Sequence, residues 1–231
     1  MICPDEYLYS DTAVLNAALS ASVAETLRAR ISAHGKAVLV VSGGSTPQMM
    51  LQALSQQKLD WSKVTILLAD ERWVDPSSDR SNEKMVRACL LQNEAKDARF
   101  KGLHLSGCKP DEAPSRLEEG LAFLEEGIDV LLLGMGEDGH TASLFPCAEN
   151  ISDLLSEQND AKTVMVRPQT APDTRISLSF GVLVKAGLTC LHITGEMKKE
   201  IWQKVSSGHL EAPVGQVFKK AQGQIRLYWA P

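Results

Sequence analysis

The sequence predicts an α/β fold: a single Rossmann-like domain of three layers with a mainly parallel central sheet. Short, continuous apolar runs of strand length alternate along the chain with amphipathic segments of helical length, which is the pattern of strand and helix units in a parallel sheet. Several of the apolar runs stop abruptly at glycine or at charged residues. No internal repeat or linker interrupts this alternation, so we expect residues 1–231 to form one domain.

Each predicted element is assigned from its own pattern. The apolar runs interpreted as strands are residues 37–41, 64–69, 130–133, 163–166, 188–194 and 225–229. The segments interpreted as helices are residues 11–33, 48–54, 82–91, 110–126 and 196–206. Asp11 is suited to cap the first helix, and Thr46 followed by Pro47 is suited to begin the second. Residues 175–179 fit either a strand or the start of a helix, and residues 147–160 are predicted to be irregular.

Composition excludes several classes of protein. With 231 residues, 44% hydrophobic and 23% charged, the chain has the composition of an ordinary globular protein. Its formal net charge of -5 disfavours nucleic acid or an anionic membrane as the main partner, and no apolar run approaches the ~18 residues of a membrane span. The N-terminus lacks signal-peptide features. Five scattered cysteines without a Cys-x-x-Cys pair favour free thiols over a zinc site or disulfides. We expect a cytoplasmic monomer or weak homodimer.

The turn after residues 130–133 is the most informative segment. Its glycines are Gly134, Gly136 and Gly139. They flank Asp138 and precede His140 directly. Glycine allows a backbone to approach a ligand closely, and the active sites of α/β proteins lie at the carboxyl ends of strands. The pattern therefore predicts an active-site turn, with a tight turn carrying a capping aspartate and a surface histidine as the alternative.

A second turn has the features of an anion site. Residues 42–47, Ser-Gly-Gly-Ser-Thr-Pro, lie between a strand and a helix. The free N–H groups of Gly43, Gly44, Ser45 and Thr46 and the positive end of the helix dipole would point to one spot. The segment lacks the Gly-Lys-Ser/Thr of a nucleotide-binding P-loop. A plain strand-to-helix turn is the alternative.

Charged residues at two other strand ends also suggest a ligand. Asp70, Glu71 and Arg72 directly follow an apolar strand, where burying them is costly unless they are paired or contact a ligand. Lys198 falls in the first turn of a predicted helix, where a cation opposes the helix dipole unless an anion is nearby. A solvated loop with an internal ion pair and a solvated lysine are the alternatives.

Three blocks taken together resemble the family of 6-phosphogluconolactonases and glucosamine-6-phosphate deaminases. They are residues 42–47, residues 70–74 (Asp-Glu-Arg-Trp-Val) and residues 134–146 (Gly-Met-Gly-Glu-Asp-Gly-His-Thr-Ala-Ser-Leu-Phe-Pro). The resemblance extends along nearly the whole chain and includes Arg175 and the turn at residues 195–198. The third block is similar to the lactonases in particular. The resemblance implies hydrolysis of 6-phospho-D-glucono-1,5-lactone, without metal or organic cofactor.

The resemblance, together with the chemistry of the side chains, implies roles for individual residues. His140 would activate water, since an unperturbed imidazole pKa of ~6.5 suits a general base near neutral pH. Asp138 would orient that ring or contact a substrate hydroxyl. The implied substrate-binding residues are Gly43, Gly44, Ser45, Thr46, Asp70, Arg72, Arg175 and Lys198. Of these, Lys198, Arg175 and the 43–46 loop are assigned to the phosphate and Arg72 to the sugar ring and carbonyl. Residues 212–216 depart from the family pattern, and no role is predicted for residues 213–217.

Three other functions remain open at this stage. The glycines at 134, 136 and 139 satisfy the G-x-G-x-x-G pattern of dinucleotide-binding proteins, although Pro146 interrupts the helix that such a site requires. A deaminase would use Asp70 as a proton-abstracting base. A non-catalytic sugar-phosphate-binding protein would have the same pocket and no need of His140. A serine hydrolase is disfavoured because the chain has no G-x-S-x-G motif.

Overall fold

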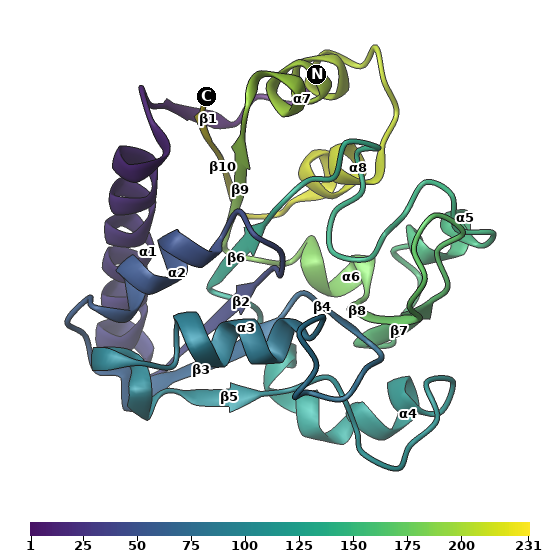
Figure 1. Cartoon of the computed structure of the whole chain (residues 1–231), viewed down its shortest axis with the longest axis horizontal. Coiled ribbons are helices and arrows are strands. Elements are labelled where there is room, and N and C mark those ends of the chain that lie inside the picture. Colours follow the sequence, from purple (N-terminus) through teal and green to yellow (C-terminus); the bar gives the residue numbers. More distant parts are fainter.

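The computed structural model describes residues 1–231 and is built on a seven-stranded parallel sheet (Figure 1). The strand order is β1-β10-β9-β6-β2-β3-β5, and every pairing between neighbours is parallel. The strands are β1 (Asp5–Leu8), β2 (Ala37–Val41), β3 (Val64–Leu68), β5 (Arg99–Lys101), β6 (Val130–Leu133), β9 (Leu188–Thr194) and β10 (Gln224–Ala230). Every residue of β2 and β6 is buried, as expected of strands covered on both faces. The predicted α/β class and mainly parallel sheet are confirmed.

A small antiparallel sheet stands beside the large one. Its order is β4-β8-β7, formed by β4 (Asp70–Arg72), β7 (Thr163–Val166) and β8 (Arg175–Leu178). Residues 175–179 thus form a strand rather than a helix start, and the short helix α6 (Phe180–Leu183) follows directly. β4 was not predicted, because its three charged residues lack an apolar pattern and because it is stabilised by pairing with β8, a strand distant in the sequence. This sheet carries Asp70, Arg72 and Arg175.

Helices cover both faces of the central sheet. Figure 1 shows α1 and α2 on one side of it and α6 and α8 on the other. Besides α6, the α-helices are α1 (Thr12–His34), α2 (Gln48–Ser55), α3 (Asn82–Cys89), α4 (Ala113–Leu117), α5 (Ile151–Leu154), α7 (Glu196–Ser207) and α8 (Pro213–Lys220). Three 3-10 helices are η1 (Trp61–Lys63), η2 (Asn93–Asp97) and η3 (Glu119–Glu126). None of the helices is long and apolar enough to cross a membrane.

The helix ends confirm one predicted cap and correct another. Asp11 accepts a hydrogen bond of 2.9 Å from the backbone N–H of Val14 and caps α1 as predicted. Thr46 does not cap α2: Pro47 occupies the cap position and makes no side-chain cap hydrogen bond. The start of α2 is therefore not closed by a local side chain.

Several other predictions differ from the structure. The predicted helix at 110–126 is divided into α4 and η3, with non-helical backbone angles at Leu121. The stretch predicted as irregular contains α5. The elements β1, β5 and α8 were not predicted. β1 and β5 are short edge strands with no fully buried residue, so they lack the apolar run that marks the inner strands.

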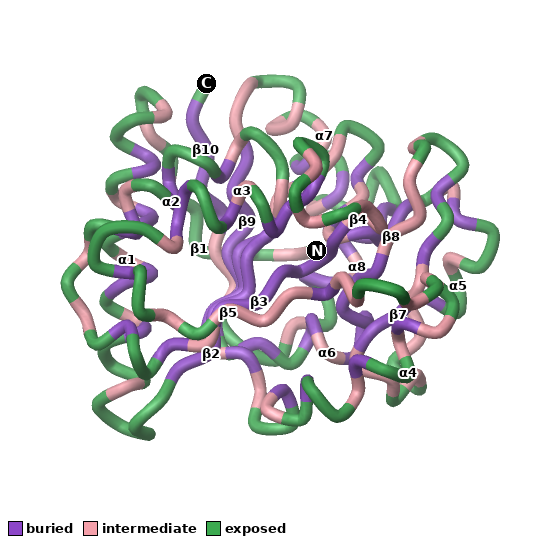
Figure 2. Tube along the Cα trace, turned by 60° about the horizontal axis from the view of Figure 1, so that its bottom comes forward, coloured by how far each residue is buried: buried purple, intermediate pink, exposed green.

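The core follows the inner strands of the central sheet. Sixty buried apolar residues form one connected cluster, and Figure 2 shows the buried residues along β2, β3 and β9 with exposed residues on the surrounding helices and loops. Because the seven strands are parallel, all their carboxyl ends lie at one edge of the sheet. The turns that carry the sequence motifs therefore meet there.

Candidate active site

One pocket of about 260 Å³ lies at the carboxyl edge of the central sheet. It is lined by the turn after β2, by β4 after β3, by the turn after β6 and by the first turn of α7 after β9. Only two of its eighteen lining residues are hydrophobic, so the pocket suits a strongly polar ligand. The lining residues predicted from the sequence are Gly43, Gly44, Ser45, Thr46, Asp70, Arg72, His140, Arg175 and Lys198.

Asp138 is the one predicted site residue that does not line the pocket. It lies behind His140 and contacts the ring: the distance between His140 Nδ1 and Asp138 Oδ1 is 2.6 Å. The same carboxylate oxygen accepts the backbone N–H of His140 at 3.1 Å. Burial acts to raise the pKa of Asp138, but the hydrogen bonds from His140 outweigh it and hold the pKa below its usual range. With Nδ1 donating to the carboxylate, Nε2 is the nitrogen left to accept a proton.

The glycines of this turn make room for the His140–Asp138 pair. A Cβ added at Gly136 would overlap Nδ1 and Cε1 of His140 and lie 2.8 Å from Asp138 Oδ1. Gly139 has φ +78° and abuts the Cβ of Ala212, and its carbonyl accepts the N–H of Val214 at 3.1 Å. Ala212 and Val214 thus support the turn from behind, and Val214 belongs to the segment 213–217, for which the sequence predicted no role.

The ring of Phe145 packs against both His140 and Arg175. The rings of His140 and Phe145 stack with centroids 4.2 Å apart, and the guanidinium carbon of Arg175 lies 5.6 Å from the centroid of Phe145. Stacking of this kind fixes the plane of a ring. The His140 ring is therefore held by a carboxylate at one nitrogen and by an aromatic face.

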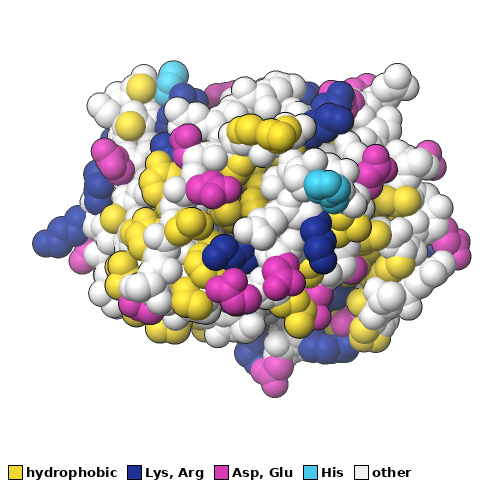
Figure 3. All heavy atoms as spheres, turned by 90° about the horizontal axis from the view of Figure 1, so that it is seen from above, with side chains coloured by type: hydrophobic (Ala, Val, Ile, Leu, Met, Phe, Trp, Pro, Cys, Tyr) yellow, Lys and Arg dark blue, Asp and Glu magenta, His cyan; other side chains and the backbone are white.

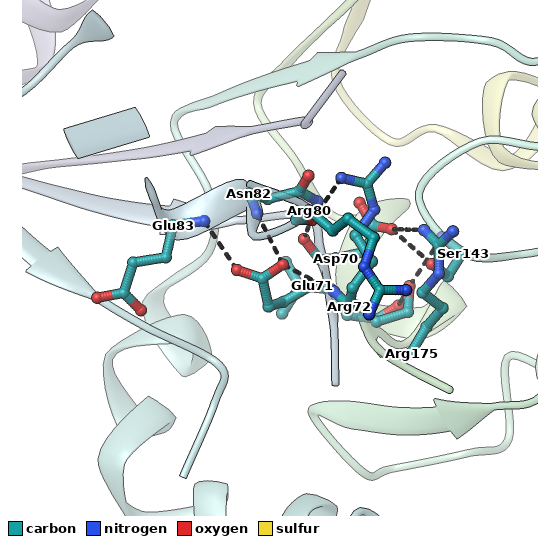
Figure 4. Close-up of polar contacts among 10 residues, drawn as sticks. Asp70, Glu71, Arg72, Arg80, Asn82, Glu83, Ser143 and Arg175 are labelled. Carbon is teal, nitrogen blue, oxygen red and sulfur yellow. Dashed lines mark hydrogen bonds and ion pairs between the residues drawn. The ribbon is translucent and has the colours of Figure 1, made fainter. Parts of the chain in front are cut away.

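Asp70 on β4 and Arg175 on β8 form an ion pair beside the pocket (Figure 4). Asp70 Oδ2 accepts a short hydrogen bond from Ser143 Oγ and lies 3.6 Å from Arg175 Nη1. The Arg175 side chain is only 12% exposed. Burial lowers its pKa, an effect that Asp70 opposes and Arg72 reinforces. Its Nε has no hydrogen-bond partner.

Two arginines face each other across the β4–β8 pairing. Arg72 and Arg175 are directly opposite in register, an arrangement that destabilises a sheet when the charges are alike. Arg72 Nη1 donates to the carbonyl of Arg80 at 2.7 Å, and both arginines line the pocket. An anion bound in front of the two arginines would offset the repulsion between them.

Glu71 has a structural function rather than one in the pocket. Its buried carboxylate accepts the backbone N–H groups of Asn82, Glu83 and Arg72 at 2.7–2.8 Å and the hydroxyl of Ser81 at 3.0 Å, which joins β4 to the start of α3 (Figure 4). Burial raises its pKa, although these four hydrogen bonds act against the rise. Asn82, held in this way, donates from Nδ2 to the carbonyl of Asp70 at 2.9 Å and lines the pocket.

The 43–46 loop leaves its backbone donors free. None of the N–H groups of Gly43, Gly44, Ser45 and Thr46 donates a hydrogen bond within the chain. They precede the uncapped start of α2, where free N–H groups and the helix dipole favour an anion. Asn82 Oδ1 lies where a Cβ on Gly43 would be, so this glycine permits the close approach.

Four buried polar residues line the pocket but were not among the predicted site residues. Ser42 and Thr141 belong to sequence blocks that had been recognised, whereas Asn82 and His192 lie outside them. Asn82 begins a helix like many other asparagines. His192 interrupts an otherwise apolar strand, which was the only available signal. In contrast, the helix that a dinucleotide site requires after Gly139 is absent: turns follow, and the next helix is α5.

Charge is mixed on one face of the molecule. On the face drawn in Figure 3, acidic and basic side chains are interspersed with apolar ones rather than gathered into a broad basic area. Such a surface gives no extended electrostatic footprint for a polyanion. The cations that converge, Arg72, Arg175 and Lys198, do so inside the pocket, which suits a small anionic ligand.

Comparison with known proteins agrees with this geometry. The model of the family "Glucosamine-6-phosphate isomerases/6-phosphogluconolactonase" matches residues 10–229. The chain belongs to this family. A protein of Rhizobium meliloti named 6-phosphogluconolactonase is 37% identical over 227 residues, 97% of this chain and 98% of that protein. One of Pseudomonas aeruginosa with the same name is 43% identical over 180 residues, 78% of this chain and 76% of that protein.

A solved structure extends the likeness to three dimensions. The crystal structure of a 6-phosphogluconolactonase from Shewanella baltica superposes with a TM-score of 0.94 at 36% identity and covers 99% of this chain and 98% of that one. The family predicted from the three sequence blocks is therefore confirmed, and the shared fold includes the sheet edge at which the pocket lies.

Proposed function

We propose that this protein hydrolyses 6-phospho-D-glucono-1,5-lactone to 6-phospho-D-gluconate, with His140 as the general base. The observation that carries the proposal is the His140–Asp138 contact of 2.6 Å at the edge of a polar pocket lined by three cations. The named relatives that match nearly the whole chain give the substrate class.

In the proposed mechanism, Asp138 holds Nδ1–H of the imidazole and Nε2 removes a proton from a water molecule. The water oxygen attacks the lactone carbonyl carbon, and the carbonyl oxygen takes up negative charge. Arg72 and N–H groups of the glycine turns would stabilise that charge, since donors placed where charge develops lower the barrier. The carbon–oxygen bond to the ring then breaks, and the imidazolium returns its proton to the leaving ring oxygen. One water is consumed, and a hydroxyl and a carboxylic acid result.

Binding of the phosphate is assigned to Lys198, Arg175 and the N–H groups of residues 43–46. The buried Arg175 has an unpaired Nε, Lys198 lies in the first turn of α7, and the loop donors are free. Asp70 is assigned to a sugar hydroxyl. Charge-assisted contacts of this type are the strong ones in phosphate recognition.

The test is a lactonase assay coupled to 6-phosphogluconate dehydrogenase and corrected for spontaneous hydrolysis. His140→Ala should lower kcat by roughly 10²–10⁴-fold, the usual contribution of a general base, with little change in the affinity for 6-phosphogluconate. His34→Ala, an exposed histidine on α1, is the matched control. A His140→Ala protein that retains more than half of the wild-type rate rejects His140 as the base.

The deaminase of the same family is the second candidate, because Asp70 lies in the pocket. Its carboxylate is held by Ser143 and Arg175, so it is less free to abstract a proton than Nε2 of His140. If the wild-type protein releases ammonia from glucosamine 6-phosphate and hydrolyses no lactone, the deaminase function replaces the lactonase function. Protein that binds sugar phosphates and does neither would be a non-catalytic binding protein.

A further inference from the structure

His192 is a buried histidine with no hydrogen-bond partner. It lies on β9, is 4% exposed, and neither Nδ1 nor Nε2 contacts a donor or acceptor of the chain. Buried polar side-chain atoms are nearly always paired, because leaving them unpaired costs free energy. The ring therefore has hydrogen-bonding capacity that no group of the chain uses.

The place of the ring shows which space a partner would occupy. The ring borders both the main pocket and a small apolar cavity beneath α2, and the two share Ser42, Pro47, Gly134 and His192. The rest of the small cavity is lined by apolar side chains of β2, α2 and β6, which offer no hydrogen bond. A partner for the ring can therefore come only from the main pocket.

The neighbours of His192 favour an anion. Burial and the nearby ammonium of Lys198 lower the pKa of His192 to about 4, so the ring is neutral near neutral pH and carries one N–H donor. Residues 42–47, with their free N–H groups, border the same end of the pocket.

We propose that His192 donates a ring N–H to the phosphate group of the bound sugar phosphate, beside Lys198, and so helps to select phosphorylated ligands. This rests on the proposed function for the identity of the ligand. A neutral donor of fixed orientation adds direction to a contact that the flexible ammonium of Lys198 supplies mainly as charge. The floor of the pocket thereby distinguishes a phosphate from a hydroxymethyl group.

The test compares two substitutions of His192. His192→Leu replaces the ring with an apolar side chain of similar bulk and so removes both nitrogens. His192→Gln restores an N–H donor. Calorimetric dissociation constants are measured for 6-phosphogluconate and for gluconate. His192→Leu should bind 6-phosphogluconate roughly tenfold more weakly, as expected for one hydrogen bond to a charged group, and gluconate unchanged. His192→Gln should recover most of the loss.

Thr189→Val is the matched control. Thr189 lies on the same strand, is fully buried, and has an equally unpaired Oγ1, but it does not line the pocket. Its substitution should change neither constant. Equal losses for the two ligands in His192→Leu would show that the histidine only supports the fold and would overturn the proposal.

A measurement on the wild-type protein does not depend on whether the variants fold. Inorganic phosphate is titrated into the wild-type protein while the ¹⁵N resonances of the His192 ring are followed by NMR. The resonances should shift with phosphate and remain unchanged with chloride. No shift at saturating phosphate overturns the proposal. Wild-type protein that hydrolyses no lactone but shows the shift would overturn the proposed function alone.

Discussion

The two sides of the pocket differ in how completely their polar groups are paired. On the turn after β6, the carboxylate of Asp138 and the ring of Phe145 already hold His140. Elsewhere, buried atoms lack partners: Arg175 Nε, Asn82 Oδ1 and both nitrogens of His192. The proposed base already has its partners within the chain, whereas the proposed binding groups still have free hydrogen-bonding atoms. This difference separates turnover from affinity, and substitutions on the two sides should reveal it.

The largest effect is expected where the preformed side is disrupted. Gly136→Ala introduces a Cβ that overlaps the His140 ring and crowds Asp138, so the ring must move. We expect kcat to fall by roughly 10²-fold or more, approaching the loss of the base itself, while 6-phosphogluconate still binds.

Gly134→Ala, in the same turn, is the control, because an added Cβ there meets nothing within 4 Å. Its kcat should remain within severalfold of wild type in the coupled assay. If both alanine variants lose turnover alike, the loss reflects the flexibility of the turn and not the space reserved for the His140–Asp138 pair.

A smaller and opposite effect is expected on the unpaired side. Lys198→Ala should lower the affinity for 6-phosphogluconate by roughly tenfold to a hundredfold, as expected for the loss of one charge-assisted contact. The affinity for gluconate should fall much less. Arg72→Ala should mainly lower kcat and should change the preference for 6-phosphogluconate over gluconate much less. Inhibition constants for both ligands on both variants measure the contrast.

Lys199→Ala provides the control for Lys198. The Lys199 ammonium lies 3.6 Å from the centroid of the Trp229 ring and does not line the pocket. Its loss should leave the ratio of the two constants unchanged. An equal loss for phosphorylated and unphosphorylated ligand on Lys198→Ala would place the phosphate elsewhere.

The smallest effect on activity is expected beneath the pocket, at Glu71. Glu71→Gln replaces one acceptor oxygen with an NH₂ group, which faces hydrogen-bond donors and cannot accept from them. The free energy of unfolding should fall by ~1–3 kcal/mol. A carboxyl group with a raised pKa binds more protons in the folded than in the unfolded state between its two pKa values. Its stabilisation is present below the ordinary pKa of 4.5 and is lost as pH rises through the raised value.

The stability of wild type should therefore decline with rising pH relative to Glu71→Gln, so the gap between them is wider at about pH 5 than at about pH 8. Urea unfolding at both pH values measures it, with Glu25→Gln, exposed on α1, as control. A gap that widens with pH would mean that the hydrogen bonds from α3 dominate over burial at this carboxylate.

The sequence predicted those parts of the pocket that follow apolar strands. Residues 43–46, 70–72, 134–140 and 198 come after β2, β3, β6 and β9, and a parallel sheet brings the carboxyl ends of its strands together. Local patterns were sufficient because both the strand and the turn are encoded within a few residues of each other.

Other parts were beyond local patterns for a physical reason. β4 is a strand only because it pairs with β8, about a hundred residues away. His192 lies within an apolar run, and its access to the pocket depends on the loops around it. Each of these features results from contacts between distant segments, which hydrophobic periodicity does not record.

Phe145 has a consequence for how such a pocket can change over time. Its ring contacts both His140, the proposed base, and Arg175, which is proposed to bind the phosphate. A new side chain at this position has to suit both partners at once, so few residues are acceptable there. Selection for a different ligand through Arg175 would have to act together with selection on His140. With the roles proposed for His140 and Arg175, a single aromatic ring makes substrate preference and reactivity evolve together.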